Sequence, residues 1–468
     1  MKPRTPFSSA APLSPQELQE LADLDHRALW KPFTQMSDYM GEEPLILVEG
    51  QGSWLLDGRG RALLDANASL WVNVHGHRVP EIVEAVQRQV ALLDHATLLG
   101  PTNEPAIRFA AELLAVAPKN LSRVFYSDSG STAVEVGLKM AFQYQLQCGH
   151  AGAHKRTRYL ALRGAYHGDT VGAVSVGGIE LFHDRYRPLL FDALYLSQPD
   201  YLRRPSDMDT DEFTSALLRE ADDLLDQHGD TVAALVIEPL VQGASGMVTY
   251  PRELLVGLVQ RARQAGALIL FDEVATGFGR TGEMFASTLA GIEPDLMALA
   301  KGISGGVLPL AATLATEEIH DAFLNAGSKT FFHGHSYTGN PIACAAGRAS
   351  LQLFETNQVL GDVGRIGRRL GRGLAALEDH PHVAQVRRLG VMTAVELVQD
   401  KETLTPYLAS QKVANKICRV MIERGIWIRP LGETVVVNPP FCLTDEEVDW
   451  LCAELNRAID VVTDGANP

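Results

Sequence analysis

An aspartate and a lysine, each placed after an apolar segment, are the residues of this chain best suited by type and spacing to do chemistry together. Asp272 lies in ALILFDEVATGFGRTG, and Lys301 lies in DLMALAKGISGG. A lysine amine can hold an aldehyde as a Schiff base, and a carboxylate beside a pyridine nitrogen keeps that nitrogen protonated. The pair therefore suggests pyridoxal phosphate as cofactor, although either residue alone would more often be a solvated surface charge.

A segment rich in serine supplies a candidate phosphate cradle. The short apolar run 124–126 leads into Ser-Asp-Ser-Gly-Ser at 127–131, and a helix is predicted to open near Thr132. The free amides and positive dipole of a helix start attract a phosphate dianion, while Gly130 allows close approach of the backbone and Ser131 adds a hydroxyl. An ordinary serine N-cap is the alternative interpretation.

Asp272, Lys301 and the phosphate cradle are three candidate elements of a cofactor site, and an aromatic residue among small residues is a fourth. Tyr166 lies in GAYHGDT, where its small neighbours allow a flat ring to lie against it. Tyr166 could therefore stack on the pyridine ring of the cofactor. A lone tyrosine is more often a core or surface residue, so the interpretation depends on the agreement of all four elements.

Apolar strands that alternate with helical stripes are expected to position these residues. Before Asp272, a helical stripe ends at Gly266 and a buried strand follows at 267–271; the stripe comprises Leu254, Leu255, Leu258, Val259 and Ala262. Asp272 would then lie at the end of a strand, where open α/β sheets form ligand crevices. Together with a strand predicted at 232–237, this alternation indicates a mainly parallel sheet.

The predicted organisation has three parts and an α/β fold class. Residues 1–77 form an N-terminal arm and part of a small domain, 78–338 form a large cofactor-binding domain, and 339–468 form a C-terminal small domain. In the first part, SPQE at 14–17 predicts a capped helix start. In the last part, a terminal helix is expected from Asp445.

Composition favours a soluble cytoplasmic enzyme. The 468 residues are 46% hydrophobic, enough for a large core, and none of the apolar stretches has the length and purity of a membrane span. A net charge of -16 disfavours nucleic acid and anionic membranes as partners. Five cysteines are scattered without a CxxC pair, which favours reduced thiols. The motifs HGH at 75–77 and 333–335 lack companions at a metal-ligand spacing, so no metal is expected.

Motifs along nearly the whole chain resemble those of class III, fold-type I aminotransferases, and within that class the branch that aminates 8-amino-7-oxononanoate in biotin biosynthesis. The matching stretches read WKPFTQM, VFYSDSGS, GAYHGDT, IEPLVQGASGM, FDEVATGFGRTG, KGISGG, FFHGHSYTGNP and GIWIRPLG. The resemblance implies a large domain with a mainly parallel seven-stranded sheet, a small α+β domain and pyridoxal phosphate as cofactor. It also implies a homodimer with shared active sites, and an amino donor and a keto acid acceptor as small-molecule substrates.

The resemblance assigns roles to individual residues of the cofactor site. It implies Lys301 as the Schiff-base lysine and Asp272 as the partner of the pyridine nitrogen. Gly130 and Ser131 would bind the phosphate. Tyr166 would stack on the ring and also touch the substrate.

Further implied roles involve a neighbouring subunit and the substrate carboxylate. The loop HGHSYTGNP would reach into the partner, where Gly334 lines the substrate site while His335 and Ser336 hold the phosphate. Arg429 would bind the carboxylate of the keto acid through its planar, bidentate fork. From the sequence alone, Arg429 could equally be a member of a structural ion pair.

Two departures from the family pattern concern the substrates. Members that use S-adenosylmethionine as amino donor usually carry Tyr at the position of Phe33 and a Trp pair at that of Leu70 and Trp71. These three residues are expected at the substrate site, and either lysine or S-adenosylmethionine remains open as donor. Ornithine, acetylornithine and 4-aminobutyrate aminotransferases often carry a glutamate where this chain reads GASG at 243–246. Such a class III ω-aminotransferase is the alternative function.

Two interpretations from other classes stay open. GFGRTG at 277–282 has the spacing of a dinucleotide-binding fingerprint, which would indicate an NAD-dependent oxidoreductase. Five residues, 272–276, intervene between the predicted strand and these glycines, which weakens that interpretation. The other interpretation is a catalytically silent protein that keeps the fold for assembly.

Overall fold

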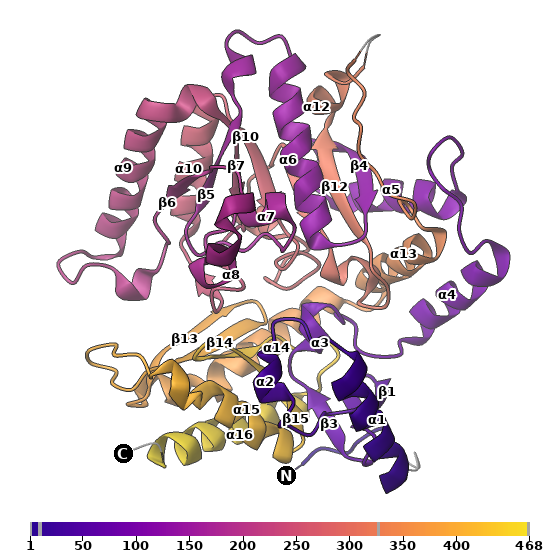
Figure 1. The fold of residues 1–468 in the computed structure, drawn as a ribbon. Helices are drawn as coiled ribbons and strands as arrows, with labels where there is room; N and C mark the ends of the chain where they lie inside the picture. The colour runs from indigo at the N-terminus through magenta and orange to yellow at the C-terminus, as the bar shows by residue number, and fades with distance from the viewer. Residues whose placement is uncertain (1, 8–11, 325–327, 466–468) are drawn as a thin grey trace.

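The structure of the protein, a computed structural model, describes residues 2–7, 12–324 and 328–465 (Figure 1). Of the predicted N-terminal arm, residues 1 and 8–11 therefore lie outside the described residues. Figure 1 shows two bodies: an upper one around a large sheet, and a lower one in which the indigo N-terminal elements lie beside the yellow C-terminal helix.

A seven-stranded sheet forms the centre of the larger body, in the order β4-β12-β11-β10-β7-β5-β6. Its strands are β4 (Leu121–Ser127), β5 (Arg158–Leu162), β6 (Leu194–Leu196), β7 (Val232–Ile237), β10 (Leu268–Asp272), β11 (Leu296–Leu299) and β12 (Ala311–Thr316). Neighbouring strands are parallel except at β12, which runs antiparallel to both of its neighbours. The predicted α/β fold with a mainly parallel seven-stranded sheet is confirmed.

Helices cover both faces of this sheet because its central strands are buried and mostly apolar. In β7, Leu235 faces α9 (Thr210–His228) and α10 (Arg252–Gln264), whereas its neighbour Val236 faces α6 (Gly130–Gln147). Successive side chains of a strand point to opposite faces, so a strand that is buried along its whole length needs cover on both sides.

The smaller body joins the two ends of the chain. One sheet combines the N-terminal strands β1 (Leu47–Gln51), β2 (Trp54–Asp57) and β3 (Ala62–Asp65) with the C-terminal β15 (Ile426–Trp427). A second, antiparallel sheet has the order β13 (Val383–Leu389), β14 (Met392–Leu397), β17 (Thr434–Val437) and β16 (Arg429–Leu431). Three helices accompany these sheets: α14 (Val359–Gly373), α15 (Val413–Glu423) and α16 (Asp445–Asp464). The domain boundaries at 77/78 and 338/339 remain predictions.

Local sequence signals placed several helix ends correctly. The N-terminal helix α1 (Pro15–Ala28) begins after Ser14, whose side chain and backbone form the predicted capping box with Glu17. The terminal helix α16 begins at Asp445, as expected. By contrast, α6 begins at Gly130, two residues before the predicted start, because Ser129 is its N-cap.

The remaining elements are short or connect the two bodies. They are α2 (Met36–Tyr39), α3 (Ala68–Trp71), α4 (Pro80–Leu92), α5 (Glu104–Val116), α7 (Val171–Ser175), α8 (Glu180–His183), β8 (Val241–Gln242), β9 (Val248–Thr249), α11 (Ala286–Ala290), α12 (Glu317–Asp321) and α13 (Pro341–Thr356). Within the described residues, every helix is too short or too polar to cross a membrane.

Candidate active site

A cavity of about 450 Å³ lies at the carboxyl ends of the strands of the large sheet. Asp272 ends β10, Lys301 follows β11, and Tyr166 follows β5. Gly130 and Ser131 open α6, just after β4. Because these four strands point in the same direction, their carboxyl ends meet at one edge of the sheet. The structure therefore brings the five residues predicted for the cofactor site of one subunit together around one cavity.

The buried Asp272 carboxylate is oriented by two hydrogen bonds. His167 donates from Nδ1 to Asp272 Oδ2 at 2.7 Å, and the Val274 amide donates to Oδ1 at 3.0 Å. No role was predicted for His167, although it directly follows Tyr166 in the GAYHGDT motif. An oriented carboxylate is the partner that a protonated pyridine nitrogen requires.

Lys301 combines a strained backbone with a perturbed side chain. It begins a short 3₁₀ helix (Lys301–Ser304) with φ +49°, in the left-handed region, and its Nζ lies 5.3 Å from the centre of the Trp71 ring. Burial lowers the pKa of the Lys301 amine, although the negative charges of Asp272 and Glu238 oppose this shift. A lowered pKa increases the neutral, nucleophilic fraction of the amine near neutral pH.

The start of α6 combines the two features that were predicted as alternatives, an anion site and a serine N-cap. Ser129 is the N-cap, so both interpretations of this segment apply. A Cβ atom on Gly130 would lie 2.6 Å from Val274 Cγ1, so the close packing requires glycine. Ser131 Oγ accepts a hydrogen bond from the Asp169 amide at 2.9 Å and retains its own proton to donate. Amides at a helix start are available to a phosphate.

The Tyr166 phenol is held in its neutral form. Its hydroxyl donates to Asp169 Oδ2 at 2.7 Å. Burial and this neighbouring carboxylate raise the pKa of Tyr166 far above its usual value. Tyr166 therefore presents a neutral ring to the cavity, which suits stacking against a heterocycle.

Glu238 is a buried carboxylate in the cavity wall for which no role was predicted. It accepts hydrogen bonds from the amides of Tyr166 at 3.1 Å and Gly243 at 2.8 Å. Burial raises the pKa of Glu238 to about 7, while His167 and the two amides oppose the shift. The sequence contained a signal for this residue, because Glu238 directly follows an apolar strand, as Asp272 does.

The predicted substrate residues divide between the cavity and its surroundings. Trp71 is buried and lines the cavity. Leu70 and Phe33 lie outside the lining and are 47% and 61% exposed. Phe33 meets the ring of Phe182 edge-on at 5.5 Å, and Phe182 meets Tyr166 in the same way at 6.1 Å. This aromatic row connects the surface near Phe33 with the cavity.

The residues predicted to act across subunits lie away from the cavity of their own chain. Gly334, His335 and Ser336 belong to the segment before α13, and the Ser336 carbonyl accepts a hydrogen bond from His95 Nε2 at 2.8 Å. Arg429, for which a different role was predicted, the binding of the keto acid carboxylate, begins β16 with an exposed side chain. These four predicted residues are not among those that line the cavity within the described part of the single chain.

The glycine-rich segment 277–282 does not have the geometry of a dinucleotide fingerprint. It forms turns after β10 and leads to the five-residue helix α11, whereas the fingerprint opens directly into a long helix. Arg280 in this segment is fully buried and donates to the backbone carbonyls of Asn438 at 3.3 Å and Pro439 at 2.6 Å. The segment therefore connects the two bodies of the molecule.

The groups around the cavity fit pyridoxal phosphate. Lys301 supplies an amine for the aldehyde, and Asp272 supplies an anion for the ring nitrogen. Tyr166 offers a ring for stacking. The start of α6 supplies amides for the phosphate.

Comparison with known proteins identifies the family. The aminotransferase class-III model matches residues 37–459. The adenosylmethionine-8-amino-7-oxononanoate aminotransferase of Nitratidesulfovibrio vulgaris is 48% identical over 97% of this chain and 84% of its own length, and that of Geobacter sulfurreducens is 47% identical over 96% and 99%.

Solved structures agree with this assignment. The structure of the Methanocaldococcus jannaschii adenosylmethionine-8-amino-7-oxononanoate aminotransferase has a TM-score of 0.89 and 39% identity, covering 95% of this chain and 99% of that one. A pyridoxal phosphate-bound amine transaminase from an uncultivated Pseudomonas species has a TM-score of 0.89 and 33% identity, covering 93% and 99%. The chain belongs to the class III aminotransferases and is an enzyme that uses pyridoxal phosphate.

Proposed function

We propose that this aminotransferase converts 8-amino-7-oxononanoate to 7,8-diaminononanoate in biotin biosynthesis, with lysine or S-adenosylmethionine as amino donor. The observation that carries the proposal is 48% identity over 97% of the chain to an adenosylmethionine-8-amino-7-oxononanoate aminotransferase. The architecture of the cavity supports the same chemistry.

Each residue of the site has a task in this proposal. Bound pyridoxal phosphate supplies the electron sink that stabilises negative charge at the reacting carbon. Asp272, oriented by His167, keeps the ring nitrogen protonated. Lys301 would hold the cofactor, then take a proton from the donor carbon as general base and deliver it, as general acid, to the cofactor carbon that carried the aldehyde. Its lowered pKa favours the neutral form that accepts this proton.

The cavity walls suit an aliphatic keto acid. Trp71, Val307 and Leu308 line the cavity with apolar surface that a hydrocarbon chain can cover. In 8-amino-7-oxononanoate, the ketone and the carboxylate lie near opposite ends of the molecule. We assign Arg429, which begins β16 with an exposed side chain, to anchor the carboxylate.

The small residue Ala244 in the cavity wall supports 8-amino-7-oxononanoate over the substrates of ornithine, acetylornithine and 4-aminobutyrate aminotransferases. Ala244 lines the cavity in the GASG segment, where ornithine, acetylornithine and 4-aminobutyrate aminotransferases often carry a glutamate. Without that carboxylate, the wall at this position is apolar. This supports a hydrocarbon chain beside Ala244 rather than a second charged group.

We also propose a homodimer with shared active sites in the cytoplasm. The segment that carries Gly334, His335 and Ser336 lies away from its own cavity, as a loop that serves a partner would. Large apolar side chains near it are exposed, namely Leu99 at 88% and Phe332 at 80%, and such surface favours burial against another protein. All five cysteines lie in the described residues and are free thiols, which supports a reducing compartment.

The test is product formation by the purified enzyme with pyridoxal phosphate, 8-amino-7-oxononanoate and either donor supplied separately. Mass spectrometry should detect 7,8-diaminononanoate with at least one donor. Failure with both donors, while ω-amino acids and pyruvate react, would contradict the proposal and favour another class III ω-aminotransferase. As a control, Lys301→Ala should form no product and no borohydride-fixed cofactor. Lys412→Ala, which removes a surface lysine paired with Asp38, should retain both.

A further inference from the structure

The turn 243–247 forms part of the cavity wall and has an unusual backbone. Ala244 lines the cavity, and a Cβ atom on Gly243 would lie 3.2 Å from Cζ3 of Trp71, so the turn directly supports this ring. Gly246 and Met247 are consecutive left-handed residues, with φ of +89° and +57°. Left-handed backbone is unfavourable for methionine, so surrounding contacts must hold the turn in place.

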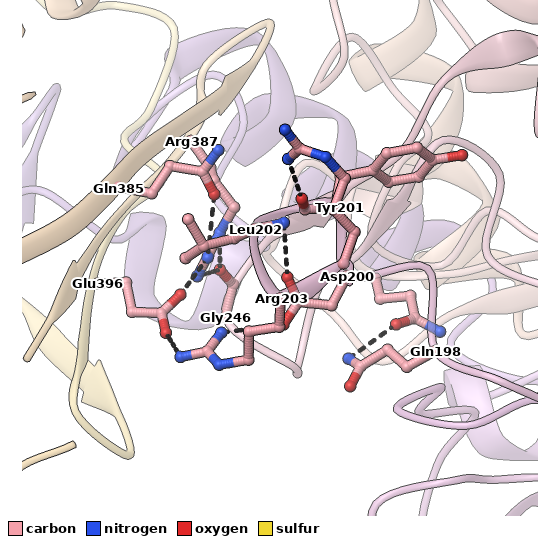
Figure 2. Close-up of polar contacts among 11 residues, drawn as sticks. Gln198, Asp200, Tyr201, Leu202, Arg203, Gly246, Gln385, Arg387 and Glu396 are labelled. Atoms are coloured by element: carbon pink, nitrogen blue, oxygen red, sulfur yellow. Dashed lines mark hydrogen bonds and ion pairs between the residues drawn. The ribbon is translucent and has the colours of Figure 1, made fainter. Parts of the chain in front are cut away.

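Hydrogen bonds from three sides hold this turn. The Gly243 amide donates to Glu238 Oε2 at 2.8 Å, and Ser245 Oγ donates to the Gly164 carbonyl at 2.5 Å. The third contact comes from the smaller body, because Arg387 of β13 donates to the Gly246 carbonyl from Nε at 3.1 Å and from Nη2 at 2.7 Å. Figure 2 shows this two-pronged contact.

Arg387 is itself fixed by a buried ion-pair network. Its side chain is buried, and Nη1 pairs with the Glu396 carboxylate, which also pairs with Arg203 (Figure 2). Arg203 in turn donates to Asp200 Oδ2 at 2.9 Å. Burial alone would raise the pKa of Glu396, but the guanidinium groups of Arg203 and Arg387 together lower it. The carboxylate therefore stays charged and keeps Arg387 in its orientation.

Apolar contacts join the same two regions. Met247 and Trp71 form a buried cluster with Met392 and Ala394 of β14 and Val436 of β17. In the β13–β14 pairing, Arg387 lies opposite Ala394. The C-terminal sheet thus supports the turn through an apolar cluster and the Trp71 ring, and through Arg387 at the Gly246 carbonyl.

We infer that Arg387 is a positioning residue for transamination: held by Glu396, it fixes the turn 243–247 and so sets the position of Ala244 and Trp71 against the substrate. The inference rests on the aminotransferase chemistry of the family, and does not depend on which keto acid is the substrate. Arg387 acts through the turn and is not itself one of the residues that line the cavity.

The test compares Arg387→Met, Glu396→Gln and Arg203→Met with Arg261→Met. Arg261 is the matched control, because it makes a bidentate pair with Asp222 between α9 and α10. KM and kcat are measured for whichever donor and acceptor the wild type uses. Hydrogen exchange of peptides spanning 239–250 provides a readout that needs no substrate.

Arg387→Met is expected to raise KM about tenfold with a smaller change in kcat, because misplaced substrate contacts weaken binding and alignment. Its amides at Gly246 and Met247, which both donate to the Gly243 carbonyl, should exchange faster. Glu396→Gln and Arg203→Met, the latter at a half-exposed residue, should raise KM and amide exchange in the same direction but by less. If Arg387→Met does not fold, these two variants test the inference. Arg261→Met should leave KM and this exchange unchanged.

The inference would be overturned if the three network variants kept the KM of the wild type and its amide exchange at 239–250. This holds whatever the melting temperatures of the variants. If the wild-type enzyme does not turn over 8-amino-7-oxononanoate, that result contradicts the proposed function instead. In that case the exchange measurement still decides the role of Arg387.

Discussion

His167 Nδ1 lies 2.7 Å from Asp272 Oδ2, and both side chains are buried beside the cavity. The second carboxylate oxygen accepts from the Val274 amide. The carboxylate is therefore held at both oxygens. His167 is the side chain that sets its direction toward the ring nitrogen in the proposed mechanism.

Replacing His167 by leucine should slow catalysis while the cofactor remains attached. The variant loses a hydrogen bond to a charged group, which corresponds to a decrease in kcat of roughly 10- to 100-fold. Steady-state kinetics provides kcat, and borohydride reduction followed by mass spectrometry confirms that Lys301 still carries the cofactor. A wild-type kcat in this variant would show that the histidine has no part in orienting Asp272.

The sequence predicted the residues of the site that follow recognisable strands, but not the contacts between them. Asp272 and Lys301 could be placed together because carboxyl ends of parallel strands converge at one edge. The contact of His167 with Asp272 depends on the spatial order of β5, β7 and β10, which is not encoded in any local pattern. The Arg387–Gly246 contact joins residues 141 positions apart in different bodies of the molecule, so it required the structure.

Glu238 should make the stability of the cofactor-free enzyme depend on pH. Burial raises the pKa of this carboxyl from 4.5 to about 7 in the folded state. Between these pH values the folded protein binds more protons than the unfolded chain, so the free energy of unfolding falls as the pH rises. The total contribution is about 3 kcal/mol, present in full below about pH 4.5 and lost as the pH rises through about pH 7.

Urea unfolding midpoints of wild type and Glu238→Gln, measured between about pH 5 and about pH 7, check this linkage. The wild-type midpoint should fall more steeply with rising pH than that of the variant, because glutamine does not titrate. Equal pH dependence of the two midpoints would mean that Glu238 keeps an ordinary pKa in the folded protein.

Hybrid dimers should reveal whether two chains share each active site. Lys301→Ala and a His335→Ala, Ser336→Ala double variant should each be inactive or strongly impaired alone. After mixing and subunit exchange, a heterodimer contains one site with an intact Lys301 from one chain and an intact phosphate loop from the other. About a quarter of wild-type activity should return when random exchange makes half of the dimers hybrid. No recovery, with exchange verified by mass spectrometry, would place the loop outside the partner's site.

Phe33 and Leu70 should set the preference for the amino donor. Both are exposed near the cavity, and both differ from the Tyr and Trp usual in members that use S-adenosylmethionine. Phe33→Tyr with Leu70→Trp adds a hydroxyl and an indole. An indole attracts a sulfonium cation by about 0.5 to 2 kcal/mol, which corresponds to a gain of roughly 2- to 30-fold in affinity for S-adenosylmethionine.

Single-turnover reactions with each donor, followed through the change in cofactor absorbance, measure this preference. The double variant should gain in kcat/KM for S-adenosylmethionine relative to lysine, whereas Leu408→Trp, which adds an indole at a position that is 67% exposed, should not. An unchanged ratio in the double variant would mean that the donor is selected elsewhere, because the added hydroxyl and indole are the groups by which this chain departs from those members.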